Sequence, residues 1–324
     1  MSRAVLHLAG AALMIVLGAS GTAAHAQPAF PQQPLRIVAG ATPGGTVDTM
    51  ARLLAEGLSA QLKQTVLVEN RPGANGAIAA DVVAKAKPDG YTLLLGTSGL
   101  TTLPLLQKNL PYNLNRDLAP VAIAAFTPFL LFAGQNSQAS SVANLIAYAK
   151  ANPQKLSVGS GDGTTLMASE LFKAAAGIQV LSANYRGGPQ MITDIVGGSV
   201  DYGFLGATAV MPMAKAGKLR VLAVASNKRL AIAPDVATLP ELGVSGVFME
   251  PWLGIMVPQG TDGAIVRTLE RALATATQSE NYLKKVTEIG STPRFLNAEA
   301  AAAYIATEQK NLAQVANAAG IRPE

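Results

Sequence analysis

Short apolar runs alternate with longer amphipathic stretches along most of this chain, and this alternation restricts its possible folds more than any other feature. Short apolar runs bounded by turn residues are typical of buried strands, and apolar residues spaced three and four apart indicate helices. The expected strands are residues 35–39, 66–69, 91–95, 156–158, 180–185, 202–205 and 219–225. The expected helices are residues 46–62, 77–85, 141–150, 164–176, 189–196 and 208–216. This order predicts an α/β fold with largely parallel sheets.

Two apolar stretches divide the chain into two lobes. Residues 119–134 are the most apolar part after the N-terminus, and we expect them to form a buried strand that crosses from one lobe into the other. Residues 252–257 are expected to cross back, followed by a mostly helical segment with one short strand near 293–296. We therefore predict lobe I from residues 27–126 plus 252–324, and lobe II from residues 127–251. Two lobes joined by two crossovers form a hinge.

Residues 1–26 have the features of a secretion signal. Arg3 supplies a positive start, residues 4–18 are apolar, and Ala24-His25-Ala26 has the small-x-small pattern of a cleavage site. The apolar run is shorter than the roughly 18 residues that a spanning helix needs, so we expect cleavage rather than a membrane anchor. The chain contains no Cys to carry a lipid. We expect the mature protein in the periplasm of a Gram-negative cell.

The composition of the mature part excludes most enzyme classes. Both histidines, His7 and His25, lie in the predicted signal, and Cys is absent. The mature protein therefore has no imidazole base, no thiolate and no His or Cys metal ligand, and we expect neither a metal nor a cofactor. Loss of Arg3 lowers the net charge from +5 to +4. This mild excess favours small anions but lacks the clustered basic residues that nucleic acid requires.

Two Gly-rich turns have matching surroundings. Residues 40–46 (Gly-Ala-Thr-Pro-Gly-Gly-Thr) and 159–165 (Gly-Ser-Gly-Asp-Gly-Thr-Thr) each follow an expected strand and open an expected helix. Such a turn leaves backbone N–H groups unpaired at the positive end of the helix dipole, which favours an anion. One turn in each lobe predicts a carboxylate gripped from both sides. Alternatively, both are ordinary turns in which Gly provides a positive φ and Thr caps the helix.

Two further junctions have the same strand–turn–helix form. They are residues 185–189, with Gly187 and Gly188 before Pro189, and residues 206–208. Arg186 either counters an anion or is a solvated arginine, and the sequence does not separate these alternatives. Asp48 is expected to cap or brace its loop rather than to act as a base. No pair of carboxylates stands out as an acid–base couple.

A series of short motifs extends along the sequence. The motifs follow one another over nearly the whole mature chain, and together they are specific although each alone is weak. They are Pro43-Gly44-Gly45-x-x-Asp48-x-x-Ala51-Arg52, Val68-Glu69-Asn70-Arg71-Pro72-Gly73-Ala74, Pro88-Asp89-Gly90-Tyr91-Thr92-Leu93-Leu94, Leu110-Pro111-Tyr112, Arg116-Asp117-Leu118-Ala119-Pro120-Val121, Glu170-Leu171-Phe172, Tyr185-Arg186-Gly187-Gly188 and Trp252-x-Gly254-x-x-x-Pro258-x-Gly260-Thr261.

Together these motifs resemble the Bug, or TctC-like, periplasmic receptors of tripartite tricarboxylate transporters. This resemblance implies a type II periplasmic-binding-protein fold that closes around an organic acid. It also implies that backbone amides, hydroxyls and water hold one carboxylate, without an arginine clamp, and that the partner is a tripartite transporter in the membrane. Such receptors usually act as monomers. The ligand-binding residues that the resemblance and the turns together suggest are Pro43, Gly44, Gly45, Asp48, Thr97, Ser98, Ser160, Thr164, Thr165, Gly187, Gly188 and Thr208.

The chain departs from the family pattern at three positions near the expected pocket, Ala41, Leu166 and Gly206. These changes predict a roomier and more apolar distal pocket, and a ligand less polar than citrate or aspartate. Three alternatives remain: the same fold as a sensor input, a secreted enzyme that uses Asp, Glu or Lys, and the effector domain of a cytoplasmic regulator. The signal and the lack of a helix-turn-helix segment disfavour the last, and the scarcity of convergent titratable groups disfavours the enzyme.

Overall fold

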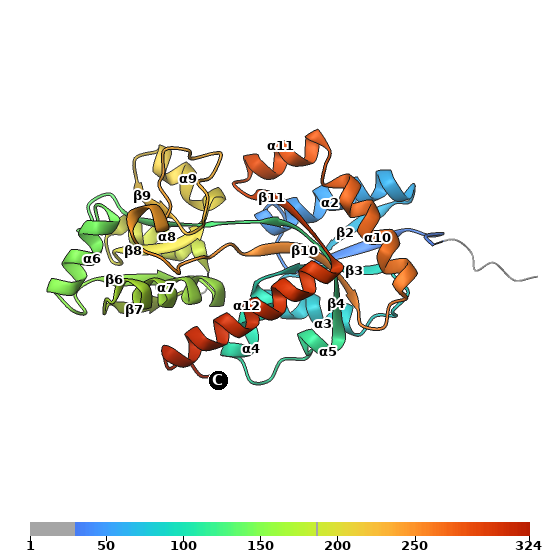
Figure 1. Cartoon of the computed structure of the whole chain (residues 1–324), viewed down its shortest axis with the longest axis horizontal. Coiled ribbons are helices and arrows are strands. Elements are labelled where there is room, and N and C mark those ends of the chain that lie inside the picture. Colours follow the sequence, from blue (N-terminus) through green and yellow to red (C-terminus); the bar gives the residue numbers. More distant parts are fainter. Residues whose placement is uncertain (1–29, 186) are drawn as a thin grey trace, which may run out of the picture.

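The computed structural model describes residues 30–185 and 187–324. The signal expected at residues 1–26 and the ambiguous Arg186 lie outside the described residues. Two sheets form the framework, with strand orders β11-β4-β10-β3-β1-β2 and β7-β6-β8-β5-β9. We call the six-stranded sheet with its covering helices lobe I, and the five-stranded sheet with its helices lobe II; they lie side by side in Figure 1.

Lobe I contains β1 (Leu35–Ala39), α2 (Thr46–Leu62), β2 (Val66–Asn70), η1 (Ala74–Gly76), α3 (Ala77–Ala84), β3 (Thr92–Thr97), α4 (Gly99–Leu106), α5 (Leu114–Asp117), β4 (Leu118–Phe126), β10 (Trp252–Pro258), α10 (Gly263–Ala276), α11 (Glu280–Glu288) and β11 (Thr292–Asn297). Lobe II contains β5 (Phe129–Gly134), α6 (Val142–Ala151), β6 (Ser157–Ser160), α7 (Gly163–Ala176), β7 (Leu181–Asn184), α8 (Gly188–Gly197), β8 (Tyr202–Gly206), α9 (Ala207–Lys215), β9 (Leu219–Val224) and η2 (Pro240–Leu242). The chain ends with α12 (Ala298–Ala318).

The α/β class is confirmed, but the expectation of largely parallel sheets is wrong. β1 pairs in parallel with β2 and β3, and β6 pairs in parallel with β7 and β8. The pairings of β10 with β3 and β4, of β11 with β4, and of β5 with β8 and β9 are antiparallel. β5 and β10 make four of these five antiparallel pairings, because each enters its sheet from the other lobe rather than from a helix of its own lobe, and β11, which follows α11 of lobe I, makes the fifth.

The expected single strand over residues 119–134 is also wrong, since two strands replace it. β4 ends at Phe126 in lobe I and β5 starts at Phe129 in lobe II. Pro128 has no N–H for a ladder, so pairing breaks there. Across the break, the N–H of Thr127 donates to the carbonyl of Pro251 at 2.7 Å, and that of Phe129 to Met249 at 3.0 Å. The two crossovers are therefore hydrogen-bonded to each other.

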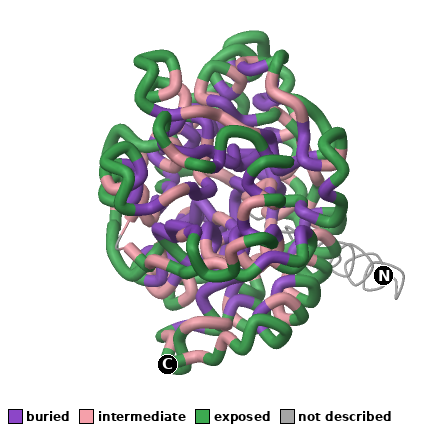
Figure 2. The backbone as a smooth tube through the Cα atoms, turned by 90° about the vertical axis from the view of Figure 1, so that its left-hand side faces the viewer, coloured by how far each residue is buried: buried purple, intermediate pink, exposed green. Residues whose placement is uncertain are grey.

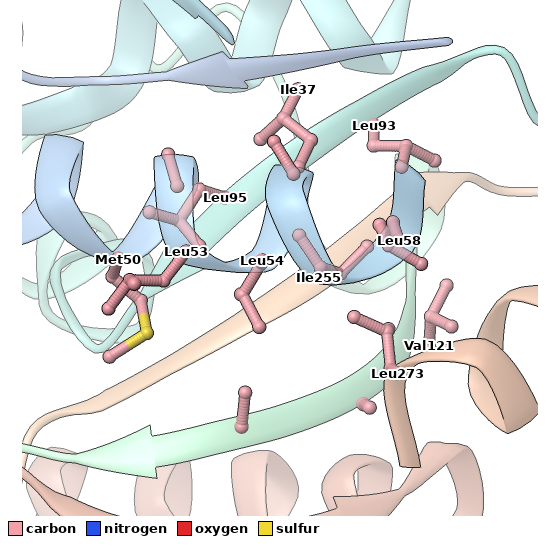
Figure 3. Close-up of a cluster of buried hydrophobic side chains, with 14 of the residues drawn as sticks. Ile37, Met50, Leu53, Leu54, Leu58, Leu93, Leu95, Val121, Ile255 and Leu273 are labelled. Atoms are coloured by element: carbon pink, nitrogen blue, oxygen red, sulfur yellow. The ribbon is translucent and has the colours of Figure 1, made fainter. Parts of the chain in front are cut away.

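Helix α2 illustrates how burial of one apolar face stabilises a helix in this fold. Met50, Leu53, Leu54 and Leu58 recur on one face of this helix and are buried. In Figure 3 this face packs on the sheet side chains, with Leu273 of α10 beside it. Burial of one such side chain contributes about 2 kcal/mol. Figure 2 shows buried backbone concentrated in the interior of the molecule and exposed backbone at its edge.

Helix α12 contacts the cores of both lobes. Ala301 and Ile305 in its first half pack with Trp252 and other lobe I residues, and Leu312 and Ala316 in its second half pack with the lobe II core. Figure 1 shows this helix (red) lying across the two lobes. The lobe boundaries predicted above stay a prediction, and α12 adds a third link between the lobes. No helix within the described ranges is long and apolar enough to cross a membrane.

Candidate functional site

A cavity of about 430 Å³ lies between the two lobes. Its floor includes the crossover residues Thr127, Phe129, Pro251 and Trp252, and its walls come from both lobes. This volume is in the range of small-molecule sites in proteins. The hinge position means that any ligand held there contacts both lobes at once.

Six helices begin at this cavity. The lining contains the first residues, or the preceding N-cap residues, of α2, α3 and α4 from lobe I and of α7, α8 and α9 from lobe II. These are Thr46, Val47, Gly76, Ala79, Gly99, Leu100, Gly163, Thr164, Gly188, Pro189, Gly206, Thr208 and Ala209. A helix start has unpaired backbone N–H groups and the positive end of the helix dipole. Helix starts in the lining therefore favour an anion in the ligand space where no carboxylate of the protein occupies them.

The side chains around the cavity are mostly apolar or hydroxylic. Apolar lining comes from Leu94, Leu95, Leu103, Leu205, Leu253 and others, and hydroxyls come from Thr46, Thr97, Ser98, Thr102, Thr127, Thr164 and Thr208. Over residues 30–185 and 187–324 the lining contains no Lys, Arg or His, and its charged side chain is Asp162. A ligand anion would be held by amides and hydroxyls, while its body would contact hydrocarbon.

The two lobes are closed around the cavity. Across the opening, the hydroxyls of Thr46 and Thr208 are 2.8 Å apart, and those of Thr127 and Ser291 are 2.9 Å apart near the hinge. A Cβ added at Gly163 would come within 2.5 Å of Leu106 Cδ1 in the facing lobe. Gly at this position lets α7 approach α4 closely.

Of the residues suggested from the sequence, five line the cavity: Thr97, Ser98, Thr164, Gly188 and Thr208. Pro43, Gly44, Gly45, Asp48, Ser160, Thr165 and Gly187 lie outside the lining found in the described part of the chain. Of the three family departures, Gly206 lines the cavity, whereas Ala41 accepts a hydrogen bond from Asn70 and Leu166 packs against the lobe II core.

Asp48 braces the first Gly-rich turn. Its Oδ2 accepts hydrogen bonds from the N–H of Gly44 and from Nε of Arg52, both at 2.9 Å, and its Oδ1 accepts from Nδ2 of Asn70 at 2.9 Å. The hydrogen bond from Arg52 is the largest of the causes that lower the pKa of Asp48 to about 2. The anion-binding capacity of this turn is thus occupied by a carboxylate of the protein itself.

The second Gly-rich turn is occupied in the same way. Asp162 Oδ1 accepts from the N–H of Thr165 at 2.8 Å, and the hydroxyl of Thr165 accepts from the N–H of Asp162 at 2.9 Å, which forms a capping box on α7. Ser160 lies beneath, with its hydroxyl 3.4 Å from that of Ser169. Thr165 and Ser160 are therefore used in holding the turn.

The starts of α8 and α9 have no such internal anion. Gly187 precedes α8 and Gly206 precedes α9, and within the described residues no side chain caps either helix. Gly188 at the start of α8 and Thr208 in the first turn of α9 both line the cavity. At the third junction, the hydroxyl of Tyr185 donates to Asp194 at 2.8 Å, which directs it away from an anion role.

Sequence reasoning missed Trp252 and Glu308. The single Trp of the chain lines the cavity, and its indole N–H donates to Glu308 Oε2 at 2.8 Å. Glu308 lies on the buried stripe of α12, between Ile305 and Leu312. An acid at this place in an apolar stripe was the available signal, because a buried charge requires partners.

These features define a class: a two-lobed solute-binding protein with a carboxylate-suited site at its hinge. The chain belongs to the family described as "Tripartite tricarboxylate transporter family receptor", whose sequence profile matches residues 50–321. The resemblance noted from the motifs is thereby confirmed, as is the binding-protein fold. The receptor role follows from this membership.

Relatives and solved structures agree with this assignment. Protein BugT of Bordetella pertussis is 33% identical over 301 residues, which cover 90% of this chain and 91% of that protein. A solved R. palustris protein with adipate has a TM-score of 0.81 and 33% identity, covering 91% of this chain and 100% of that one. MatC from Rhodopseudomonas palustris with bound malate has a TM-score of 0.75 and 26% identity, covering 89% and 100%.

Proposed function

We propose that this chain is a periplasmic receptor that captures a small organic acid between its lobes and delivers it to a tripartite transporter in the membrane. The proposal includes a non-catalytic role, a monomeric state and export through cleavage after residue 26. The main support is one observation: six helix starts surround a mostly apolar cavity whose described lining contains no cationic side chain.

The anion would be held at the starts of α8 and α9. Within the described residues these two helix starts, like those of α3 and α4 in lobe I, have no capping side chain, while Asp162 satisfies α7. A carboxylate accepts hydrogen bonds from backbone N–H groups and gains from the dipole behind them. The hydroxyls of Thr208 and Thr46 lie 2.8 Å apart, so one donates to the other and the pair has one further proton to donate to the anion.

The remainder of the ligand would be largely apolar. The wall opposite α8 and α9 is formed by Leu94, Leu95, Leu103 and Leu253 with Ala79. A second carboxylate buried there would lose its hydration without a cationic partner, which is costly. A relative of similar fold holds adipate, whose four-carbon spacer is apolar, and another holds malate. We therefore expect hexanoate or benzoate, each with a single carboxylate, to bind more tightly than malate or citrate.

The test is a binding screen on the mature protein. Native mass spectrometry of protein purified from its own periplasm should reveal a co-purified acid, and thermal shifts should rise with carboxylates that bind the folded state. Isothermal titration would then rank hexanoate, benzoate, adipate, malate and citrate. A ranking led by citrate would contradict the apolar pocket. Failure of every acid to bind would contradict the receptor proposal, and conversion of a bound acid to a product would contradict its non-catalytic part.

A further inference from the structure

Glu308 is the charged member of an otherwise apolar stripe on α12. The stripe runs through Ala301, Ile305, Glu308, Leu312 and Ala316 at helical spacing. Residues before Glu308 pack on the lobe I core, and residues after it pack on the lobe II core. Glu308 therefore lies where the helix passes from one lobe to the other.

Both carboxylate oxygens of Glu308 point at buried donors. Oε1 accepts from the hydroxyl of Ser98 at 2.9 Å, and Oε2 accepts from the hydroxyl of Thr101 and the indole N–H of Trp252, both at 2.8 Å. Ser98, Thr101 and Trp252 are each at most 2% exposed. Burial raises the pKa of Glu308, and the three hydrogen bonds oppose that rise.

Two of these donors belong to the cavity. Ser98 is at the corner between β3 and α4, and Trp252 is where the crossover enters lobe I; both line the ligand space. They are joined directly as well, since the N–H of Trp252 donates to the hydroxyl of Ser98 at 2.9 Å and the N–H of Ser98 donates to the carbonyl of Trp252 at 3.3 Å. The lining found for the described residues does not include Glu308 itself.

Each donor group in this cluster has one proton to donate, so the geometry of the cluster depends on the acceptor Glu308. An indole N–H can only donate, so Trp252 requires an acceptor in the protein interior. The hydroxyl of Ser98 has one proton, which it gives to Glu308 while accepting from Trp252. The carboxylate thus determines both the rotamer of Ser98 and the orientation of the indole ring. Removing it would leave the hydroxyl of Ser98 and the indole N–H of Trp252 without this acceptor, whereas the hydroxyl of Thr101 would keep the carbonyl of Ser98 at 2.7 Å.

We propose that Glu308 is a positioning residue for ligand capture: without touching the ligand, it holds Ser98 and Trp252 in the geometry that the closed cavity requires. The effect on ligand affinity rests on the proposed receptor function. The effect on the geometry of Ser98 and Trp252 does not, and the two are measured separately.

The variant is Glu308→Gln, which keeps the size but replaces one acceptor with an NH₂ donor that faces other donors. Glu299→Gln, at an exposed position of the same helix, is the matched control. The ligand is whichever of hexanoate, benzoate, adipate, malate and citrate binds the wild type most tightly by isothermal titration. We expect Kd to rise about tenfold in Glu308→Gln and to stay within twofold in the control.

A double-mutant cycle with Ser98→Ala distinguishes positioning of Ser98 by Glu308 from a general loss of rigidity in the protein. If Glu308 acts through Ser98, Glu308→Gln should raise Kd by no more than about threefold in the Ser98→Ala background. If the two substitutions instead raised Kd independently, the Kd of the double variant would rise by the product of the two single effects. That result would overturn the proposal. So would a Kd for folded Glu308→Gln within twofold of the wild type.

Hydrogen exchange tests the geometry without any ligand. The amides of Ser98 and Trp252 should exchange at least fivefold faster in Glu308→Gln than in the wild type, while amides of α10 are unchanged. If no acid binds the wild type, the receptor proposal fails, and this exchange still judges the role of Glu308. Unchanged exchange at Ser98 and Trp252 overturns that role, and faster exchange with unchanged affinity reduces Glu308 to a structural brace.

Discussion

Helices α7 and α9 begin at the same cavity in the same lobe, but their first turns are satisfied differently. Asp162 caps α7 through the N–H of Thr165, whereas no side chain in the described ranges caps α9. The preceding sequence is richer in glycine at α7, with three glycines in residues 159–163, than at α9, with two in residues 203–207. Glycine allows backbone amides to be exposed at a turn. Whether those amides remain available to a ligand depends on whether a carboxylate of the protein lies close enough to accept from them.

The same contrast separates the turn before α2 from the start of α9. The first turn has the pattern Pro43-Gly44-Gly45 and satisfies the N–H of Gly44 with Asp48. Arg52 and Asn70 fix that carboxylate from the other side. The two turns that resemble anion sites in sequence therefore donate to carboxylates of the protein itself, Asp48 and Asp162. The junction at Gly206 lines the cavity, and no side chain in the described ranges caps the helix that follows it.

The largest effect is expected from a substitution that places a carboxylate at the start of α9, as Asp162 does at the start of α7. Thr208→Asp should weaken binding of the tightest acid about 100-fold, because a fixed negative charge would occupy the helix start and repel the ligand. The neutral variant Thr208→Asn has similar size and should weaken binding only about threefold. Titration calorimetry on both variants measures the difference. Equal affinities for the two would show that the ligand anion lies elsewhere.

Removing Asp48 tests the bracing role assigned to the first turn. Asp48→Ala should lower the free energy of unfolding by about 2 kcal/mol, because the N–H of Gly44 and the side chains of Arg52 and Asn70 lose their acceptor. Urea denaturation at pH 7 provides the measurement. Asp89→Ala, in a surface turn of the same lobe, is a comparison that retains all three contacts. A stable Asp48→Ala variant that binds no acid would instead make Asp48 part of the site.

The pKa of Asp48 predicts how this contribution depends on pH. The folded pKa is about 2, below the ordinary 3.8, so the stabilisation is fully present above 3.8 and is lost as pH falls toward 2. The difference in unfolding free energy between the wild type and Asp48→Asn should therefore shrink by about 1 to 2 kcal/mol between pH 5 and pH 2.5. Urea unfolding of both proteins at the two pH values tests this. A difference that is constant with pH would argue against an ionised, paired Asp48.

The smallest expected effect is at the cap of α7. Asp162→Ala should lower the unfolding free energy by about 1 kcal/mol through loss of the N-cap hydrogen bond. Affinity should not fall, because the amides freed at α7 add capacity for an anion beside α9. Parallel denaturation and titration measure both quantities. A loss of affinity as large as that of Thr208→Asp would mean that Asp162 contacts the ligand.

Much of the fold was accessible from local patterns. The strand at residues 35–39 and the helix at 46–62 were expected with the bounds that β1 and α2 have. Helix α4 was missed, because Gly99 and Pro104 are poor helix formers and tertiary packing of Leu100 and Leu103 overrides that tendency. The break between β4 and β5 was missed although Pro128 marked it.

Less of the candidate site could be predicted from the sequence. Thr97, Ser98, Thr164, Gly188 and Thr208 line the cavity, and their role as ligand contacts stays a prediction. Asp48 and Thr165 resemble ligand contacts in sequence, but their side chains bond to their own turns. Glu308 is 210 residues from Ser98, and only packing of α12 across both lobes brings them together.

The sequence by itself determined the alternation of strands and helices, the absence of His and Cys from residues 27–324, and the motifs that identify the family. These depend on composition and on neighbours within a few residues. Only the tertiary structure decided which helix starts remain open to a ligand and which buried groups hold the cavity. The physical reason is that an amide or a carboxylate is satisfied by whatever partner folding brings within about 3 Å, and that partner can be distant in sequence.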